Sequence, residues 1–223
     1  MRRISAYFIN LLIVAWTFSA NAQDSIIVMP MKIRIGADVY GPVSYFINKN
    51  TLSIEGYFSI DIDTQKAVVA ETGYLDFRYS QYNYNYQTKG TFIRLGVDFN
   101  LIHPEKAMGK YYAGIGLRYG LSIFKSDVPF FEQSNYWGSV TGSIPPSTHV
   151  AHFIEASPGI RTEIFRNFSM GWVIRLRILI YSGTGKDNKA VSIPGYGNGV
   201  KSFNPGINYY LIWSIPYKSQ KVK

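Results

Sequence analysis

Apolar and polar residues alternate along most of the chain from residue 31 onward. In the segment 90–101, for example, Ile93, Leu95 and Val97 alternate with Arg94 and Gly96. Successive side chains of a β-strand point to opposite faces, so a period of two predicts strands. The pattern, clear in four segments and less regular in four others, predicts eight strands, at 31–40, 51–63, 67–80, 90–101, 110–125, 149–164, 168–181 and 203–217.

The connections between these segments alternate in length. The short ones are 64–66, 102–109 and 165–167, and the longer ones are 41–50, 81–89, 126–148 and 182–202. Short turns at one end and longer loops at the other, on an even number of antiparallel strands, are typical of outer-membrane barrels. The sequence therefore predicts an all-β fold, a closed eight-stranded antiparallel transmembrane β-barrel over residues 31–217, with both termini on the periplasmic side.

A soluble eight-stranded barrel or a β-sandwich is the competing fold, because alternation alone does not say which face points inward. The predicted strands are about 12–16 residues long, whereas strands of globular proteins most often have about 5–6. Aromatic residues also gather near strand ends, as interface girdles require. Both features favour the membrane. These aromatic residues are Tyr111, Phe168, Trp172, Trp213 and Tyr217.

The first residues have the pattern of an export signal. Met1-Arg2-Arg3 is basic, residues 4–18 are apolar, and Ala20-Asn21-Ala22 offers small residues at the positions that a signal peptidase reads. We expect a signal peptide over residues 1–22, a periplasmic N-terminal segment over 23–30 and a basic periplasmic tail over 218–223. The expected location is the outer membrane of a Gram-negative bacterium.

Composition narrows the chemistry further. Cysteine is absent, which excludes disulfides, thiolate metal ligands and a lipoprotein anchor. The formal net charge of +9 would suit nucleic acid or an anionic surface. Export argues against nucleic acid, so the expected partners are outer-membrane lipids, including lipopolysaccharide, and another outer-membrane or periplasmic protein.

If the apolar faces point outward, the opposite faces carry a dense set of charges into the barrel. An eight-stranded barrel is only wide enough to be filled by side chains, and unpaired charges there are costly. We therefore predict an ion-pair network that plugs the lumen, with Arg94, Arg118, Arg161, Arg175 and Arg177 paired to carboxylates. The network is expected to comprise Arg34, Asp38, Glu55, Asp61, Asp76, Arg78, Arg94, Asp98, Arg118, Glu155, Arg161, Glu163, Arg175 and Arg177.

In the third predicted strand, the same reading places Glu71 on the lipid-facing parity. It would lie near the periplasmic end of that strand, where a charge costs little.

No residues are expected to be catalytic or to bind a cofactor or a metal. The spacing of His149, His152 and Glu155 could suit zinc on a helix, but on a strand it points the two histidines to opposite faces. The best catalytic alternative is His149 with Glu155 and Ser147, which share one face of the sixth strand. It would make the chain a lipid A- or phospholipid-modifying enzyme.

Strand six departs from a regular lipid-facing row. It places His152 and Pro158 on its outward parity, and Pro158 cannot donate a ladder hydrogen bond, which predicts a bulge. A polar or broken row in hydrocarbon is costly unless a partner covers it. A second membrane protein docked along strands six to eight is one interpretation, and a local bulge satisfied within the barrel is the other. The predicted partner-binding residues are Tyr136, Trp137, His152, Pro158 and Ile160.

The two longest predicted loops, 126–148 and 182–202, contain several aromatic and proline residues. Such loops indicate a folded cap or a surface for a partner, and local packing over the barrel mouth is the alternative.

Several short motifs resemble a family of small outer-membrane β-barrel proteins of Gram-negative bacteria. The likeness spans nearly the whole chain after residue 22, and no catalytic residues come with the family. The resemblance implies a non-enzymatic envelope component, an accessory subunit of machinery that assembles or exports outer-membrane proteins. The matching stretches are Gly36-Ala37-Asp38, Thr88-Lys89-Gly90, Gly116-Leu117-Arg118-Tyr119-Gly120, Asn135-Tyr136-Trp137-Gly138, Ile193-Pro194-Gly195-Tyr196 and 204–216.

Overall fold

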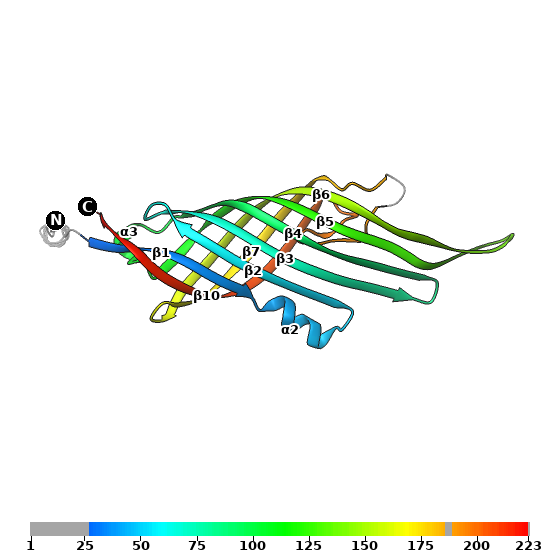
Figure 1. Cartoon of the computed structure of the whole chain (residues 1–223), viewed down its shortest axis with the longest axis horizontal. Coiled ribbons are helices and arrows are strands. Elements are labelled where there is room, and N and C mark those ends of the chain that lie inside the picture. Colours follow the sequence, from blue (N-terminus) through cyan, green and yellow to red (C-terminus); the bar gives the residue numbers. More distant parts are fainter. Residues whose placement is uncertain (1–26, 186–188, 223) are drawn as a thin grey trace, which may run out of the picture.

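The computed structural model describes residues 27–185 and 189–222 (Figure 1). The predicted signal peptide, residues 1–22, lies outside the described residues. Eight long strands make up most of the fold: β1 (Ile27–Asp38), β2 (Thr51–Asp61), β3 (Lys66–Gln81), β4 (Tyr84–Asn100), β5 (Tyr111–Asn135), β6 (Gly138–Phe165), β7 (Phe168–Tyr181) and β10 (Phe203–Val222).

These strands close into a barrel. Their order is β1-β10-β7-β6-β5-β4-β3-β2, every neighbouring pair is antiparallel, and β1 pairs with β2 to complete the ring. This confirms the predicted closed eight-stranded antiparallel barrel. Both ends of the described chain lie at one end of the barrel, and the long β5–β6 hairpin extends from the other (Figure 1). We call these the terminal end and the hairpin end.

The barrel is apolar outside and polar inside. On each strand the exposed positions are large apolar side chains, of which Ile35, Ile93, Leu117, Ile174 and Trp213 are examples. The positions between them are mostly buried and carry charged, small polar and glycine residues, together with apolar ones such as Val69, Phe92 and Phe153. The outward direction of the apolar faces therefore agrees with the sequence prediction for every strand except β3.

In β3 the predicted faces are reversed. Val69 and Glu71 are buried inside the barrel, whereas Asp76 and Arg78 lie on the outer face, where Asp76 forms ion pairs with Arg78 and with Lys89. The assignments of Asp76 and Arg78 to the lumen and of Glu71 to the lipid face were wrong. Both faces of this strand carry apolar residues, so hydrophobicity alone could not decide between them.

The hairpin end is built from longer strands than the sequence predicted. β5 and β6 continue to a turn at Tyr136 and Trp137, so most of the predicted loop 126–148 is a two-stranded extension. β4 begins at Tyr84, which reduces the predicted loop 81–89 to a tight turn. These strands continue well beyond the point where the apolar alternation stops. They can do so because the hydrogen bonds between strands join backbone groups and do not need an apolar face.

Next to the end of β1, a short helix takes the place of a strand in the wall of the barrel. This strand ends at Asp38, and α2 (Tyr40–Ile47) then packs against β2 and β10. Asp38 was expected in the ionic network. Its carboxylate instead accepts hydrogen bonds from the backbone N–H groups of Gly41, at 2.8 Å, and Tyr209, at 3.1 Å. It thus satisfies backbone groups at the point where the strand gives way to the helix.

At the terminal end, pairing extends beyond the predicted barrel limits. β1 and β10 remain paired from Ile27 opposite Val222 onward, with a bulge between Met31 and Lys32. These paired residues include part of the segments 23–30 and 218–223. The predicted turn 102–109 contains the short helix α3 (Pro104–Ala107).

The connection 182–202 folds over the hairpin end of the lumen. It contains the small hairpin of β8 (Ser192–Ile193) and β9 (Gly197–Asn198). Ile193 and Tyr196 are fully buried and belong to one apolar cluster with Phe124 and Phe153 of the barrel wall. The described residues of this connection thus pack over the barrel mouth, and we call them the cap.

Candidate functional site: the charged interior

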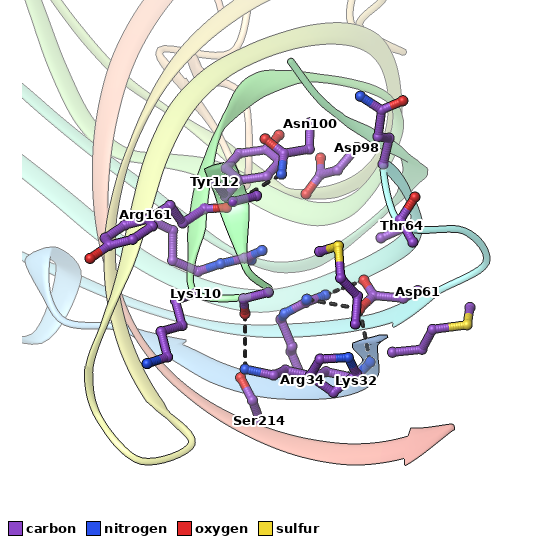
Figure 2. A pocket seen from close by; sticks show the side chains of 18 of the residues that line it. Lys32, Arg34, Asp61, Thr64, Asp98, Asn100, Lys110, Tyr112, Arg161 and Ser214 are labelled. Atoms are coloured by element: carbon purple, nitrogen blue, oxygen red, sulfur yellow. Dashed lines mark hydrogen bonds and ion pairs between the residues drawn. The ribbon is translucent and has the colours of Figure 1, made fainter. Parts of the chain in front are cut away.

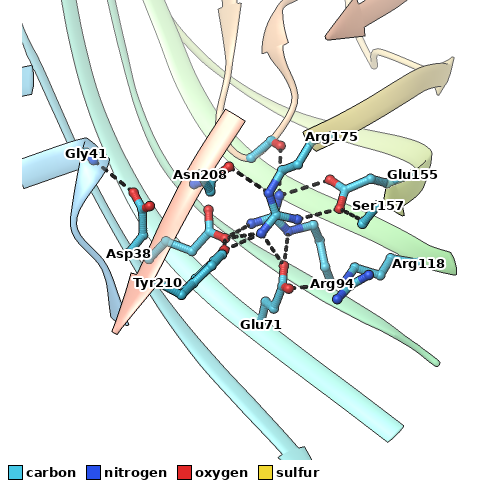
Figure 3. Close-up of polar contacts among 12 residues, drawn as sticks. Asp38, Gly41, Glu71, Arg94, Arg118, Glu155, Ser157, Arg175, Asn208 and Tyr210 are labelled. Atoms are coloured by element: carbon cyan, nitrogen blue, oxygen red, sulfur yellow. Dashed lines mark hydrogen bonds and ion pairs between the residues drawn. The ribbon is translucent and has the colours of Figure 1, made fainter. Parts of the chain in front are cut away.

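Two arginines form the centre of the lumen (Figure 3). Arg94 of β4 is completely buried, with its Nε 2.9 Å from Glu71 and its Nη1 3.1 Å from Glu155. Arg175 of β7 is also completely buried and lies 2.6 Å from Glu55 and 3.0 Å from Glu71. Arg94 also pairs with Glu55, and Arg175 with Glu155. Three carboxylates from three different strands are thereby shared between two guanidinium groups.

Two further arginines extend this centre. Arg118 of β5 lies with its Nε 3.0 Å from Glu71 and its Nη2 2.9 Å from Asp98. Arg177 of β7 lies 3.2 Å from Glu155 and donates a hydrogen bond of 2.9 Å to the carbonyl oxygen of Tyr196 in the cap. The central cluster, defined as Arg94, Arg118, Arg175, Arg177, Glu55, Glu71, Asp98 and Glu155, thus joins the barrel wall to the cap.

The central cluster contains four cations and four carboxylates. This balance matters because each buried ion costs several kcal/mol to take from water, and only close opposite charges offset that cost. The planar fork of arginine can bind two carboxylates at once, which a lysine ammonium does less well. The central cluster is therefore neutral as a whole.

Glycine makes room for these bulky groups. A Cβ atom at Gly116 would overlap both the Arg118 guanidinium and the Asp98 carboxylate. Any side chain at this position would displace the ion pair between those residues.

Two separate ion pairs lie nearer the terminal end. Arg34 binds the Asp61 carboxylate through both of its terminal nitrogens, and Lys32 lies 2.5 Å from Glu163. Lys32 and Glu71 lie inside the barrel but were not predicted there. Lys32 shares the parity of Arg34, and this signal could have identified it. Glu71 is the direct cross-strand neighbour of Arg94, which only the strand register shows.

Arg161 departs from the prediction. In the part of the chain that the structure describes, no carboxylate lies within ion-pairing distance of it. It donates a hydrogen bond of 3.4 Å to the Tyr57 hydroxyl, and its guanidinium lies 4.9 Å from the centre of the Tyr112 ring. Its predicted pairing with a carboxylate was wrong, because Asp98 is engaged by Arg118 instead.

The residues of the catalytic alternative are only partly brought together. Ser147 Oγ lies 2.7 Å from His149 Nε2, and His149 Nδ1 lies 3.1 Å from the carbonyl oxygen of Gly183. Glu155 is six positions farther along β6, roughly 20 Å at the usual rise of a strand, and its carboxylate belongs to the central cluster. Among the described residues, no carboxylate is bonded to this Ser–His pair.

The predicted partner-binding residues lie in two places. Tyr136 and Trp137 are at the tip of the β5–β6 hairpin with 93% and 90% of their surfaces exposed. His152 and Pro158 lie on the outer face of β6, together with the exposed Ile160.

Two premises of the predicted docking surface differ from the structure. His152 already has a partner, because its Nδ1 lies 2.6 Å from the Tyr119 hydroxyl. The predicted bulge at Pro158 is absent, because the register of β6 with β7 is the same before and after it, with Ala156 opposite Leu176 and Gly159 opposite Val173. Pro158 is instead accommodated by a gap in the pairing with β7.

Among residues 27–185 and 189–222, no cluster of three or more histidine, aspartate or glutamate side chains is arranged to hold a metal ion.

None of the helices in the described part of the chain is long and apolar enough to cross a membrane.

A family model described as "Domain of unknown function (DUF6048)" matches residues 2–220. The chain belongs to this family. A comparison with curated proteins gives no match.

Two solved structures resemble the fold. Ail, the attachment invasion locus protein of Yersinia pestis, is 8% identical with a TM-score of 0.33, over 85% of this chain and 97% of its own. CarO of Acinetobacter baumannii is 11% identical with a TM-score of 0.38, over 85% of this chain and 98% of its own. Both likenesses are too distant to carry an argument about this chain.

The central cluster generates a stability prediction. Replacing Arg118 with alanine leaves Glu71 and Asp98 buried with one fewer cation, so the free energy of unfolding should fall by about 3–5 kcal/mol. The exposed Arg78→Ala, which removes an arginine from the outer face, should change it by less than about 1 kcal/mol. Urea titration of the purified protein in detergent, with the folded fraction read from heat-modifiable gel migration, measures both. Equal effects of the two substitutions would contradict the importance of the cluster.

Proposed function

We propose that this chain is an integral outer-membrane β-barrel with periplasmic termini that acts as a non-enzymatic structural or accessory subunit of a cell-envelope biogenesis complex, one that assembles or exports outer-membrane proteins. The observation that carries the membrane part is the apolar outer face of the barrel. Soluble monomers rarely expose apolar patches larger than a few hundred Å². Here all eight strands contribute exposed Ile, Leu, Val, Phe or Trp side chains.

The aromatic residues support the same location. Tyr111, Trp172, Trp213 and Tyr217 are all about half exposed on the outer face. Tyrosine and tryptophan are favoured at the level of lipid headgroups, where one part of the ring is in hydrocarbon and the polar atom is in water.

The non-enzymatic part is supported by how the interior charges are used. Each carboxylate of the central cluster is bonded to at least one arginine, so none is left to serve as a general base inside the barrel. The cap adds hydrogen bonds from Arg94 and Arg177 to the backbone carbonyls of Gly195 and Tyr196. These contacts favour a plugged scaffold rather than a lumen that holds a catalytic site.

Action through a partner is supported by the hairpin tip. The rings of Tyr136 and Trp137 contact each other edge to face, with 5.2 Å between their centres, and are otherwise exposed. Tyrosine and tryptophan are enriched in the energetically dominant centres of protein interfaces. We propose that another outer-membrane protein binds this tip and the outer face of β6, β7 and β10 around His152, Pro158 and Ile160, while lipids, including lipopolysaccharide, cover the rest.

Photocrosslinking in cells tests the partner. A photoreactive residue at position 137, 152 or 160 should give a discrete protein adduct, because these positions line the proposed interface. Controls at Phe58 and Val97 on the opposite strands should give none. If none of the five positions gave a protein adduct, this surface would have no partner.

A lipid A- or phospholipid-modifying enzyme is the second candidate, and one observation favours it. Ser147 is exposed and lies in hydrogen-bond reach of His149, while the Gly183 carbonyl can orient the imidazole through Nδ1. A serine activated by a histidine base is the beginning of a nucleophilic site. In residues 27–185 and 189–222, no carboxylate is bonded to His149 to support it as a base.

Lipid mass spectrometry distinguishes the two candidates. If the chain is non-enzymatic, lipid A and phospholipid profiles of a strain carrying Ser147→Ala, or lacking the chain altogether, should match those of the parent. An acyl chain gained or lost in both strains would favour the enzyme. The matched control is Ser143→Ala, on the same strand and away from His149.

A further inference from the structure

A pocket opens into the lumen at the terminal end (Figure 2). It has a volume of about 40 Å³, and Arg34, Arg161 and Ser214 line it from β1, β6 and β10. A second, deeper cavity of about 20 Å³ shares Arg161, Tyr112 and Asp98 with it and is lined by Arg118. The two cavities together lead from the terminal end to the edge of the central cluster.

The charges around this pocket do not balance. Arg34 is paired with Asp61, Lys32 with Glu163, and Asp98 with Arg118. The Asp38 carboxylate, which would restore the balance, is bound to backbone N–H groups elsewhere. Arg161 is therefore a cation without a carboxylate partner among the described residues, and an anion in the pocket would compensate its charge.

Hydrogen-bond donors around the cavities are also unused. Arg118 Nη1 is buried and has no hydrogen-bond partner in the described chain, and the same holds for the hydroxyl of Ser214, which is 1% exposed. A buried donor without a partner costs about 1–3 kcal/mol. Arg118 lines the deeper cavity and Ser214 the outer one, so a polar occupant would remove this cost.

We propose that this pocket binds a phosphate group, with Arg161 as its principal ligand. Guanidinium groups bind phosphate oxygens through short, charge-assisted hydrogen bonds. Ser214 and Tyr112, which line the same pocket, offer hydroxyl donors beside Arg161, so the donors come from β5, β6 and β10. The volume of about 40 Å³ leaves room for a small polar group such as a phosphate.

The phosphate group has two possible sources, free phosphate or the head of a phospholipid. The free ion would enter through the open terminal end. A phospholipid is suggested by an apolar groove on the outer wall, where Ile164, Met170 and Trp172 lie beside Ile160 and Gly171, two residues that the deeper cavity also touches. The binding chemistry at Arg161 is the same for both sources, and it does not depend on the proposed role in a complex.

Calorimetric titration of the purified full-length protein in a phosphate-free, uncharged detergent tests the site. One arm uses inorganic phosphate, and the other uses short-chain phosphatidic acid. Saturable binding of either ligand is expected, and Arg161→Gln should weaken it by roughly tenfold or more through the loss of a charge-assisted contact. Arg78→Gln, on the outer face, should bind as the wild type does.

Arg161→Lys keeps the positive charge, and it serves as a control that separates a loss of binding from a loss of folding. It should retain more affinity than Arg161→Gln, with heat-modifiable migration showing that both variants are folded. Binding of phosphate alone would assign the free ion, and binding of the lipid alone would assign the headgroup; either result supports the site. Absence of saturable binding to the wild type, or equal binding by folded Arg161→Gln, would overturn the proposal.

Discussion

The need to neutralise charge inside a barrel too narrow for bulk water governs this structure. Eight strands leave room mainly for side chains, so the arginines of the central cluster find their counter-charges on other strands. Glu71 shows the consequence most directly, since its single carboxylate lies beside Arg94, Arg118 and Arg175. Those contacts join β3 to β4, β5 and β7 across the barrel. The interior cluster thereby fixes how the strands face one another while the outer surface is left to apolar residues.

This constraint explains what the sequence could predict. Regular alternation was enough to place β2, β4, β5 and β7, and the direction of their faces followed from where the charges lie. Arg94, Arg118, Arg175 and Arg177 could be identified as interior residues because the opposite face of each of their strands is regularly apolar. The chemistry of the central cluster was therefore largely readable before its geometry was known.

The wrong predictions arise where the alternation of apolar and polar residues does not show which face points inward or which residues meet. β3 has apolar side chains on both faces, so only its register with Arg94 shows that Glu71 is inside. Arg161 was expected to be paired because it shares the inward parity, yet parity does not say which carboxylate is near enough. Helix α2 and the long β5–β6 extension escaped detection for a related reason, since neither is specified by an apolar face directed at hydrocarbon.

The two ends of the barrel differ in how they are closed. At the hairpin end, Ile193 and Tyr196 of the cap are buried against the wall, and Arg177 bonds to the cap's backbone. At the terminal end, a pocket remains beside Arg161. The interior is thus a filled polar core with one accessible end, which suits a scaffold more than a channel.

The most direct test of this account is whether the lumen conducts ions. Purified protein, shown to be folded by its heat-modifiable migration, would be inserted into planar lipid bilayers at high salt concentration. Because the central cluster and the cap fill the interior, no steady single-channel conductance should be observed. Reproducible conductance steps from the folded wild-type protein would contradict the claim that paired charges close the barrel.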